Sequence, residues 1–345
     1  MTVLADAIKK VATGPHLSKD LTLPEARLAM SEILSGQADP VQAAIFLIAL
    51  RMKRETNEEN LGLLQAIQAE TVQTTATVEQ LLLIADPYNG YNRHCPISSF
   101  LPAVLAASGL PAVSQGVKEM GPKFGITHSQ VLAYAGFDTE LSTQAATERV
   151  NHPDIGWAYI DQAQATPSLF ALQELRTRII KRPSLATLEK MTIPIKAQVK
   201  THLQIGFVHK AYPPVLSWLA QQAGFASALI IRGIEGGVLP TLREASNCFR
   251  DLNACIFEPE KFDIEQSTRG VLPVTGDIVT AQQTAELGLK ALSGQSGAAF
   301  DSLVYGSALA LWHCGLQSSQ RQAADHVRQV IKSGQALAHF NQGTD

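Results

Sequence analysis

Residues 86–125 read DPYNGYNRHCPISSFLPAVLAASGLPAVSQGVKEMGPKFG, and this stretch decides the fold class of the chain. An apolar run leads into a glycine loop around Gly90, and a helix-like stretch, a second apolar run and a second glycine loop follow. Proteins of the α/β class build pockets for phosphate or sugar in this way, because backbone N–H groups at such loops can face an anion. The stretch therefore predicts an α/β protein with a ligand pocket at its glycine loops.

Short apolar runs alternate with helical patterns through the middle of the chain, which predicts a parallel or mixed sheet wrapped by helices. The predicted strands are Leu81–Ala85, Ala112–Ser114, Gly156–Ile160, Leu203–Val208 and Ala228–Ile231. Helical spacing and N-cap residues predict four helices before residue 73, including one that opens at Asp39-Pro40 and one capped by Asn57. After Thr280 the predicted helices are Ala281–Leu292, Ala298–Cys314 and Ser319–Gly334.

These patterns predict two parts. We expect a helical subdomain over 1–75, joined by helices of about 167–195, and an α/β domain over 76–166 and 196–345. At 100° per residue through 169–182, Arg176 falls among the leucines and isoleucines of one apolar arc. A buried arginine needs an anionic partner, which is either a structural carboxylate or a bound ligand.

Composition fits a folded protein that keeps its cysteines reduced. The 345 residues are 46% hydrophobic and 17% charged, and the longest apolar run, Ala43–Leu50, is too short to span a bilayer. The N-terminus lacks the basic and apolar regions of a signal peptide, and none of the four cysteines forms a CxxC pair. We therefore expect a cytoplasmic location and no membrane association.

Charge is unevenly distributed along the chain. Between Arg176 and Lys210 there are eight basic residues and one acidic residue, a net charge of +7, so the rest of this −3 chain carries −10. Such a segment either attracts phosphate groups or forms an ordinary solvated helix surface.

The order of these features resembles the anthranilate phosphoribosyltransferases, whose fold is shared with the class II pyrimidine nucleoside phosphorylases. The resemblance spans about 2–342 and includes the four N-terminal helices, both glycine loops, the arginine-bearing helix, the RGIEGG turn at 232–237 and the late segment ALSGQSGAAFDSLVYGSALALWHCG. It implies an anthranilate phosphoribosyltransferase-like, class II nucleoside phosphorylase-like fold and a homodimer through the helical subdomain. The family's enzymes are glycosyltransferases of tryptophan biosynthesis that use phosphoribosyl pyrophosphate (PRPP) and magnesium.

The resemblance also implies a substrate or phosphate site in the cleft between the two parts. Its residues are Asn89, Gly90 and Asn92 in the first loop, Ser98 and Ser99 after it, Gly116, Lys118 and Lys123 in the second loop, and Arg176 and Arg182. Ser98 and Ser99 match a Ser-Thr pair of the family, Lys123 matches the lysine of its SSKSG stretch, and Arg176 matches an arginine that meets the anthranilate carboxylate.

The chain departs from the family where the metal and the pyrophosphate bind. Two glycines of the family's GTGGD loop are missing, and Val238 and Leu239 occupy the positions of the acidic pair that holds magnesium. Neither side chain can coordinate a hard cation, so magnesium is expected only if Glu235 substitutes. Loss of such electrostatic stabilisation costs on the order of 10²–10⁴ in rate.

The pattern therefore favours a degenerate paralogous branch that lacks the usual catalytic motifs and binds a phosphorylated ligand or nucleic acid, DNA or RNA. The candidate nucleic-acid contacts are Arg178, Lys181, Lys190, Lys196 and Lys200. The alternative is an active phosphoribosyltransferase that transfers ribose phosphate from PRPP to anthranilate or another acceptor. A phosphorylase-like enzyme, which needs a phosphate site without the metal clamp, is a third possibility.

Overall fold

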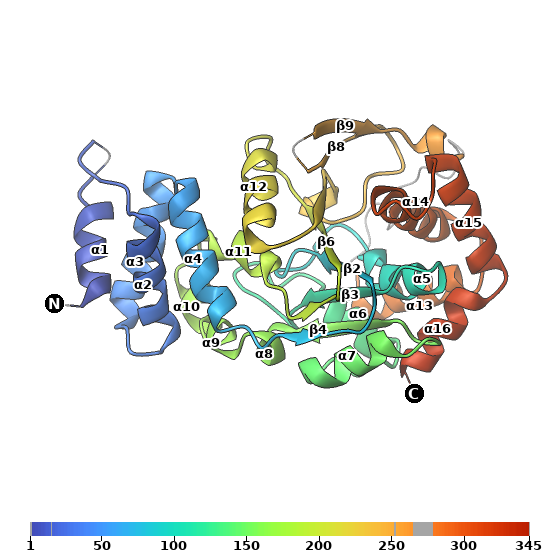
Figure 1. Cartoon of the computed structure of the whole chain (residues 1–345), viewed down its shortest axis with the longest axis horizontal. Coiled ribbons are helices and arrows are strands. Elements are labelled where there is room, and N and C mark those ends of the chain that lie inside the picture. Colours follow the sequence, from blue (N-terminus) through green and yellow to red (C-terminus); the bar gives the residue numbers. More distant parts are fainter. Residues whose placement is uncertain (1, 15, 252, 265–278, 345) are drawn as a thin grey trace.

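The computed structural model describes residues 2–14, 16–251, 253–264 and 279–344 (Figure 1). A seven-stranded sheet in the order β4-β3-β2-β6-β7-β8-β9 forms its centre. The strands are β2 (Gln80–Ala85), β3 (Ala112–Gly116), β4 (Trp157–Asp161), β6 (Lys200–Gly206), β7 (Ser227–Ile231), β8 (Ser246–Arg250) and β9 (Asn253–Phe257). The first five run parallel, whereas β8 and β9 form an antiparallel hairpin at one edge.

The N-terminal helices lie to one side of the sheet, at the left of Figure 1. They are α1 (Val3–Val11), α2 (Leu23–Leu34), α3 (Pro40–Lys53) and α4 (Asn57–Ala69). The four predicted helices are confirmed, including the capping box of Thr22 with Glu25. The predicted cap Asn57 is wrong by one residue, because the Thr56 hydroxyl accepts from the Glu59 N–H and Asn57 is already helical.

The other helices cover both faces of the sheet or connect its strands. They are α5 (Leu101–Ala107), α6 (His128–Tyr134), α7 (Thr143–Asn151), α8 (Gln162–Ala165), α9 (Pro167–Phe170), α10 (Gln173–Arg178), α11 (Leu185–Leu188), α12 (Pro213–Ala223), α13 (Ala281–Leu292), α14 (Ala298–His313), α15 (Gln320–Lys332) and α16 (Gln335–Thr344), with the 3-10 turns η1 (Ile97–Phe100), η2 (Glu189–Met191), η3 (Ile234–Gly236) and η4 (Pro259–Phe262). A separate two-stranded sheet pairs β1 (Thr74–Thr75) with β5 (Ile195–Lys196) and joins the end of the helical part to the segment before β6.

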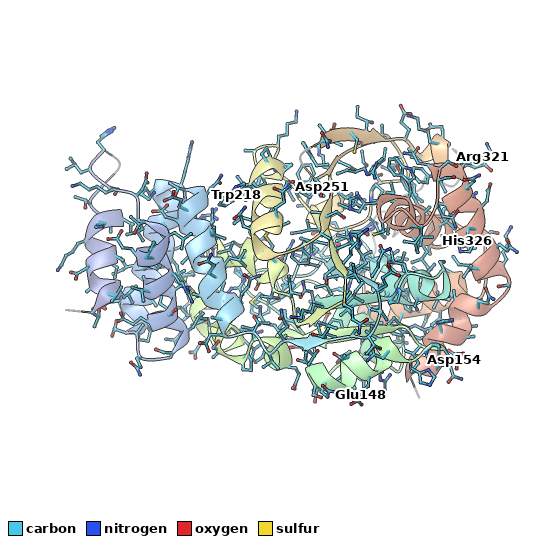
Figure 2. All side chains as sticks on the ribbon, viewed as in Figure 1. Glu148, Asp154, Trp218, Asp251, Arg321 and His326 are labelled. Atoms are coloured by element: carbon cyan, nitrogen blue, oxygen red, sulfur yellow. The ribbon has the colours of Figure 1, made fainter. Side chains whose placement is uncertain are left out.

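Alternate residues of β2 supply two hydrophobic cores. Leu82 and Ile84 join the core beneath α5 and α13–α16, whereas Leu81 and Leu83 face the core shared with the N-terminal helices and α12. Trp218 lies on the side of α12 that faces α4 (Figure 2). A strand buried on both faces is typical of a parallel sheet. Packing on both faces holds the central strands in place, and the strands in turn position the loops at their carboxyl ends.

The predicted continuous helix over 169–182 is wrong. The chain forms α9 and α10 and then leaves the helical region at Ile180, whose φ is +61°. Ile180 was expected on the apolar arc but is 67% exposed. Pro183 is consistent with the break, because it has no N–H to donate to the Ile179 carbonyl four residues earlier and its ring would clash with that carbonyl in a continuous helix.

None of the described helices is long and apolar enough to cross a bilayer.

Candidate functional site

The carboxyl ends of the parallel strands bring the predicted site residues to one edge of the sheet. Asp86 follows β2, Gly116 ends β3, and Arg232 follows β7. Ligands in open α/β sheets bind at this edge, because successive loops diverge there. The two glycine loops predicted from sequence therefore do meet, together with the 233–238 turn.

The glycines of the two loops pack against each other. Gly90 has a φ of +69°, and a Cβ built on it would lie 2.3 Å from the Gly125 carbonyl carbon. A Cβ on Gly125 would in turn lie 2.5 Å from the Tyr91 nitrogen. Backbone hydrogen bonds between Tyr91 and Ile126 then hold the loops together in both directions, at 2.8 and 2.9 Å. The glycines thus allow the two loops to pack closely, and a phosphate contact of Gly90 stays a prediction.

Asp86 lies at the centre of a buried polar network. Its carboxylate accepts hydrogen bonds from the Tyr91 hydroxyl at 2.8 Å, the Ser98 hydroxyl at 3.0 Å and the Val238 N–H at 2.9 Å. His128 Nε2 lies 2.6 Å from the same carboxylate. Burial alone would raise the pKa of Asp86, but His128 and these hydrogen bonds hold it below its usual value. Ser98, predicted as a phosphate contact, is therefore engaged within the protein.

The other ring nitrogen of His128 also has a partner. Nδ1 lies 2.7 Å from the Ser114 hydroxyl, and Nε2 lies 2.7 Å from the Ser98 hydroxyl. The network thereby links the ends of β2 and β3, η1 and the first turn of α6 beneath the glycine loops.

Lys123 and Glu235 close the loops over this network. The Lys123 ammonium lies 2.5 Å from the Glu235 carboxylate and also donates to the Gly90 carbonyl. Glu235, with a φ of +54°, further accepts from the backbone N–H groups of Asn92 and Arg93, at 2.7 Å for the latter. Burial opposes ionisation of Glu235, yet these donors hold its pKa below the usual value. Burial also lowers the pKa of Lys123 despite Glu235. The three donors around the Glu235 carboxylate stabilise its charge, which favours the ionised pair.

The residues present do not fit a magnesium–pyrophosphate group. Val238 is fully buried and Leu239 is 8% exposed, so both side chains belong to the core. Glu235, the one carboxylate named as a conditional substitute, is occupied by Lys123 and two N–H groups. No cluster of three or more metal-ligating side chains occurs in the described ranges. A hard divalent cation prefers several oxygen ligands, which this turn does not offer.

Arg176 has a structural carboxylate as its partner. Its guanidinium donates to both Glu189 oxygens, at 2.6 and 3.0 Å, and both residues are almost completely buried. Gln162 Nε2 donates to the same carboxylate at 3.1 Å, which leaves little of it free. Of the two partners left open by the sequence, the structure contains the carboxylate, and a substrate contact of Arg176 stays a prediction.

The remaining predicted contacts lie on or near the loops at the carboxyl edge of the sheet. With the Asn89 amide oriented so that its oxygen faces Arg182, that oxygen accepts from Arg182 Nε at 2.8 Å. Arg182 and Lys118 are exposed, whereas Ser99 and Gly116 are buried. Ser99 donates to the Pro96 carbonyl at 2.7 Å. Arg182 and Lys118 are thus the predicted phosphate contacts whose charges face solvent.

The basic segment does not form a single surface. Lys181 and Arg182 are exposed, Arg182 lies beside Asn89 of the first glycine loop, and the Arg182 carbonyl accepts from Arg51 of α3. Lys196 and Lys200 are exposed at the opposite edge, because Lys200 begins β6. Arg178 pairs with Glu174 at the surface. Lys190, predicted among the nucleic-acid contacts, is only 9% exposed, because η2 turns its side chain into the protein.

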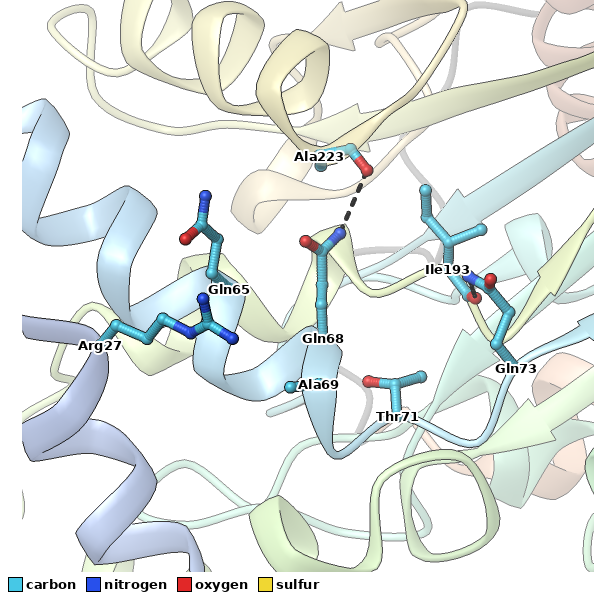
Figure 3. A pocket seen from close by; sticks show the side chains of 8 residues that line it. All are labelled: Arg27, Gln65, Gln68, Ala69, Thr71, Gln73, Ile193 and Ala223. Carbon is cyan, nitrogen blue, oxygen red and sulfur yellow. Dashed lines mark hydrogen bonds between the residues drawn. The ribbon is translucent and has the colours of Figure 1, made fainter. Parts of the chain in front are cut away.

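Two adjoining cavities lie on the Lys196 side of the molecule. The first has a volume of about 380 Å³ and lies between α2, α4 and the end of α12, where Arg27, Gln65, Gln68 and Gln73 surround it (Figure 3). Gln68 and Gln73 donate to the Ala223 and Ile193 carbonyls, so their amide oxygens are left for other donors. The Arg27 guanidinium has no hydrogen bond or ion pair with any residue that the structure describes.

The second cavity, of about 480 Å³, shares Gln73, Ile193 and Ala223 with the first and is also lined by Lys196 and Thr201. The two cavities share part of their lining and have Arg27 at one end and Lys196 at the other, with apolar residues such as Ile193 between them. We call this surface the Arg27–Lys196 groove. Cations spaced by amide and hydroxyl groups suit contacts with phosphate oxygens.

Sequence reasoning missed several residues that organise the site. His128, Tyr91 and Ser114 were not singled out, and Glu189 appeared only as the lone acid of the basic segment. The His128 signal was present in the TH pair that opens α6 after the second glycine loop. Its partners come from other loops, so only the fold brings them together.

Comparisons with known proteins agree with this architecture. Residues 5–70 match the helical bundle domain of the glycosyl transferase family, and residues 90–337 match its α/β domain. The anthranilate phosphoribosyltransferase of Methanobrevibacter smithii is 27% identical over 97% of this chain and 96% of its own length. The Thermus thermophilus anthranilate phosphoribosyltransferase structure matches with a TM-score of 0.83 at 18% identity, covering 100% of this chain and 98% of that one.

The Saccharomyces cerevisiae anthranilate phosphoribosyltransferase in complex with PRPP and Mg matches with a TM-score of 0.78 at 17% identity, covering 99% of this chain and 97% of that chain. The predicted fold is therefore confirmed. This chain belongs to the glycosyl transferase family that combines a helical bundle domain with an α/β domain, and it has the fold of the anthranilate phosphoribosyltransferases.

Proposed function

We propose that this protein binds nucleic acid through phosphate contacts and has lost PRPP-dependent transfer. The observation that carries the loss of transfer is the turn at 235–239. There Val238 and Leu239 are core residues and Glu235 is held by Lys123. A transferase would need oxygen ligands here to neutralise the departing pyrophosphate. The fold is retained, but the group that would drive the reaction has no place among these residues.

The cations of the surface support a polymeric phosphate ligand. Arg27 and Lys196 flank the Arg27–Lys196 groove, and Lys200 is exposed close by along the chain. Contacts of this kind to a phosphate backbone need no base recognition and no aromatic platform. The exposed pair Lys181 and Arg182 forms a second candidate contact near the cleft.

A titration of labelled single- and double-stranded DNA and RNA at several salt concentrations tests the proposal. We expect binding at low salt and a linear fall of log K with log salt concentration. Absence of binding to all four ligands at low salt would remove nucleic acid as the partner.

The alternative function, phosphoribosyl transfer to anthranilate or another acceptor, is favoured by the match to relatives over almost the whole chain. Incubation with PRPP, magnesium and anthranilate tests it directly. Product formation above background that Glu235→Ala abolishes would support a metal role for Glu235 and would contradict our proposal.

We also propose a homodimer through the helical subdomain. Val41, Ile45 and Met52 are 65%, 44% and 76% exposed, and their spacing places them on one stripe of α3. Light scattering should give the mass of a dimer, and Met52→Glu should shift it toward the monomer. A monomeric mass for the unmodified protein at micromolar concentration would exclude this assembly.

A further inference from the structure

Phe124, in the second glycine loop, is an exposed aromatic residue in an unfavourable backbone conformation. Its φ is +48°, and the residue is 54% exposed. The turn accounts for the backbone, because the Phe124 N–H donates to the Met120 carbonyl at 3.0 Å and the next residue, Gly125, packs on Gly90. The turn does not account for the phenyl ring, since glycine or asparagine adopts a positive φ at lower cost than a bulky residue.

The phenyl ring is held against its own loop. A Cβ built on Gly121 would lie 3.0 Å from Phe124 Cζ and 2.3 Å from Thr177 Oγ1 of α10. Glycine at position 121 therefore lets the tip of the ring and α10 both approach the loop backbone. A side chain positioned in this way loses less conformational freedom when a ligand stacks on it than a freely rotating one does.

Backbone strain gathers around this ring. Six of the described residues other than glycine have a positive φ, and Phe124, Ile180 and Glu235 are three of them. Their segments contact one another, because the second loop reaches Glu235 through Lys123 and reaches α10, which ends just before Ile180, through Gly121. Ile180 is 67% exposed, so a second apolar side chain faces solvent beside the loop. Strained residues cluster in this way at ligand sites.

One exposed arginine adjoins Phe124 through the first glycine loop. The Gly125 N–H donates to the Asn89 carbonyl at 2.9 Å, and the Asn89 amide oxygen accepts from Arg182 Nε at 2.8 Å. A guanidinium has five N–H donors, which a single amide oxygen cannot satisfy. Arg182 is exposed, so its other donors are available to a phosphate group.

A second exposed arginine adjoins the loop through Lys123. Lys123 pairs with Glu235 at 2.5 Å, and Glu235 accepts from the Arg93 N–H at 2.7 Å. The Arg93 guanidinium has no hydrogen bond or ion pair within the part of the chain that the structure describes. Lys118 and Glu119, both exposed in the second loop, offset each other, so the two arginines leave this surface positively charged.

We propose that Phe124 stacks on an unpaired base of single-stranded nucleic acid, whose phosphates contact Arg93 and Arg182. Every base has a π face, so such stacking needs no particular sequence, whereas neighbouring pairs cover the faces of bases inside a duplex. The base contact rests on the proposed function, but it lies at the carboxyl edge of the sheet. Lys196 of the Arg27–Lys196 groove lies at the opposite edge, so phosphate contacts in the groove do not depend on Phe124.

Anisotropy titrations with labelled oligonucleotides of equal length separate base contacts from phosphate contacts. The probes are oligo(dT), an oligomer of abasic deoxyribose phosphates and a blunt duplex, each at several salt concentrations. Phe124→Ala removes the ring, Phe124→Leu keeps an apolar side chain over Gly121 without the aromatic face, and Phe124→Trp keeps the aromatic face. Tyr134→Ala is the matched control, because Tyr134 of α6 is also an exposed aromatic residue, at 64%. The thermal midpoint of each variant checks that it is folded.

We expect Phe124→Ala and Phe124→Leu to weaken oligo(dT) binding by about tenfold and to leave binding of the abasic oligomer and the duplex within about twofold. Neither variant should change the slope of log K against log salt, because no phosphate contact is lost. Phe124→Trp and Tyr134→Ala should bind as the unmodified protein does. Arg182→Gln should weaken binding of both single-stranded probes.

The same titrations separate failure of the base contact from failure of the proposed function. Unchanged oligo(dT) binding in Phe124→Ala, or an equal loss for the abasic oligomer, overturns the base contact and leaves nucleic-acid binding in place. Absence of binding of every probe to the unmodified protein overturns both. A lower mass of Phe124→Ala in light scattering, without a loss specific to oligo(dT), would assign the ring to a contact between copies of the chain and would also overturn the base contact.

Discussion

The Lys123 ammonium lies 2.5 Å from the Glu235 carboxylate and joins the second glycine loop to the turn after β7. The first loop is included in the same contact, because Lys123 donates to the Gly90 carbonyl and Glu235 accepts from the Asn92 and Arg93 N–H groups. A single ion pair therefore fixes three loops where the resemblance implied a phosphate ligand and a metal.

Replacing Glu235 should loosen all three loops. Glu235→Gln removes the charge that Lys123 needs and weakens the two N–H contacts, so we expect a loss of roughly 1–3 kcal/mol in the free energy of unfolding. Denaturant unfolding measures this loss. Glu174→Gln is the matched control, because its pair with Arg178 is exposed and should contribute less than about 0.5 kcal/mol. Equal, small losses for both variants would mean that the Lys123–Glu235 pair does not hold the loops.

Gly90 should tolerate no side chain. Gly90→Ala places a Cβ 2.3 Å from Gly125 at a φ of +69°, so steric overlap and backbone strain act together. We expect a loss of about 3–5 kcal/mol in denaturant unfolding. The control is Gly109→Ala, which shares a positive φ of +93° but meets nothing within 4 Å, and should lose only about 1–2 kcal/mol from strain. If the two variants were equally stable, the loops would not be packed as described.

His313 should make stability depend on pH. Burial, Arg250 and His202 lower its pKa to about 3, and Arg250 Nε donates to its Nδ1 at 3.4 Å. In the unfolded chain His313 takes up a proton near pH 6.5, whereas in the folded protein it stays neutral to lower pH. The free energy of unfolding therefore keeps its full value above pH 6.5 and falls as the pH drops toward 3. The expected loss reaches several kcal/mol across that range.

Denaturant unfolding at pH 7.5, 6 and 5 measures this dependence. His313→Gln should flatten the decline over this range, because the group that takes up a proton on unfolding is gone. His209→Gln is the control, since His209 is exposed and should leave the decline as in the unmodified protein. If stability fell with pH just as steeply in His313→Gln, the pH dependence would come from other groups.

Charge removal in the Arg27–Lys196 groove should weaken nucleic-acid binding uniformly across sequences. Each of Arg27→Gln and Lys196→Gln should reduce the slope of log K against log salt by about 0.7–0.9 if that side chain contacts a phosphate. Lys332→Gln, on the outer surface of α15, should leave the slope unchanged. A slope reduced only by Lys181→Gln or Arg182→Gln would assign the contact to the cleft mouth and not to the groove.

Much of the architecture could be read from the sequence, because local patterns carry it. The strand alternation from residue 81, the capping box at Thr22 and the apolar spacing of the C-terminal helices predicted elements that the structure contains. The helix over 169–182 could not be predicted correctly, because a hydrophobic period extends across Ile180 while the following proline breaks it.

The candidate site depended on the tertiary structure to a greater degree. The sequence identified Gly90, Lys123, Arg176 and Glu235 as residues of one region, but it assigned none of them a named partner within the chain. Their partners, Gly125, Glu189 and the loop N–H groups, lie in other segments and become neighbours only when the strands align.

By itself, the sequence determined that two oxygen donors are missing at Val238 and Leu239 and that a parallel sheet presents glycine loops at one edge. Only the tertiary structure decided that these loops close on each other and that Arg176 is neutralised by Glu189 of the same chain. The reason is physical. The residue type decides which groups a side chain can bind, whereas burial and the charges that the fold places nearby decide whether the side chain is free to bind a ligand.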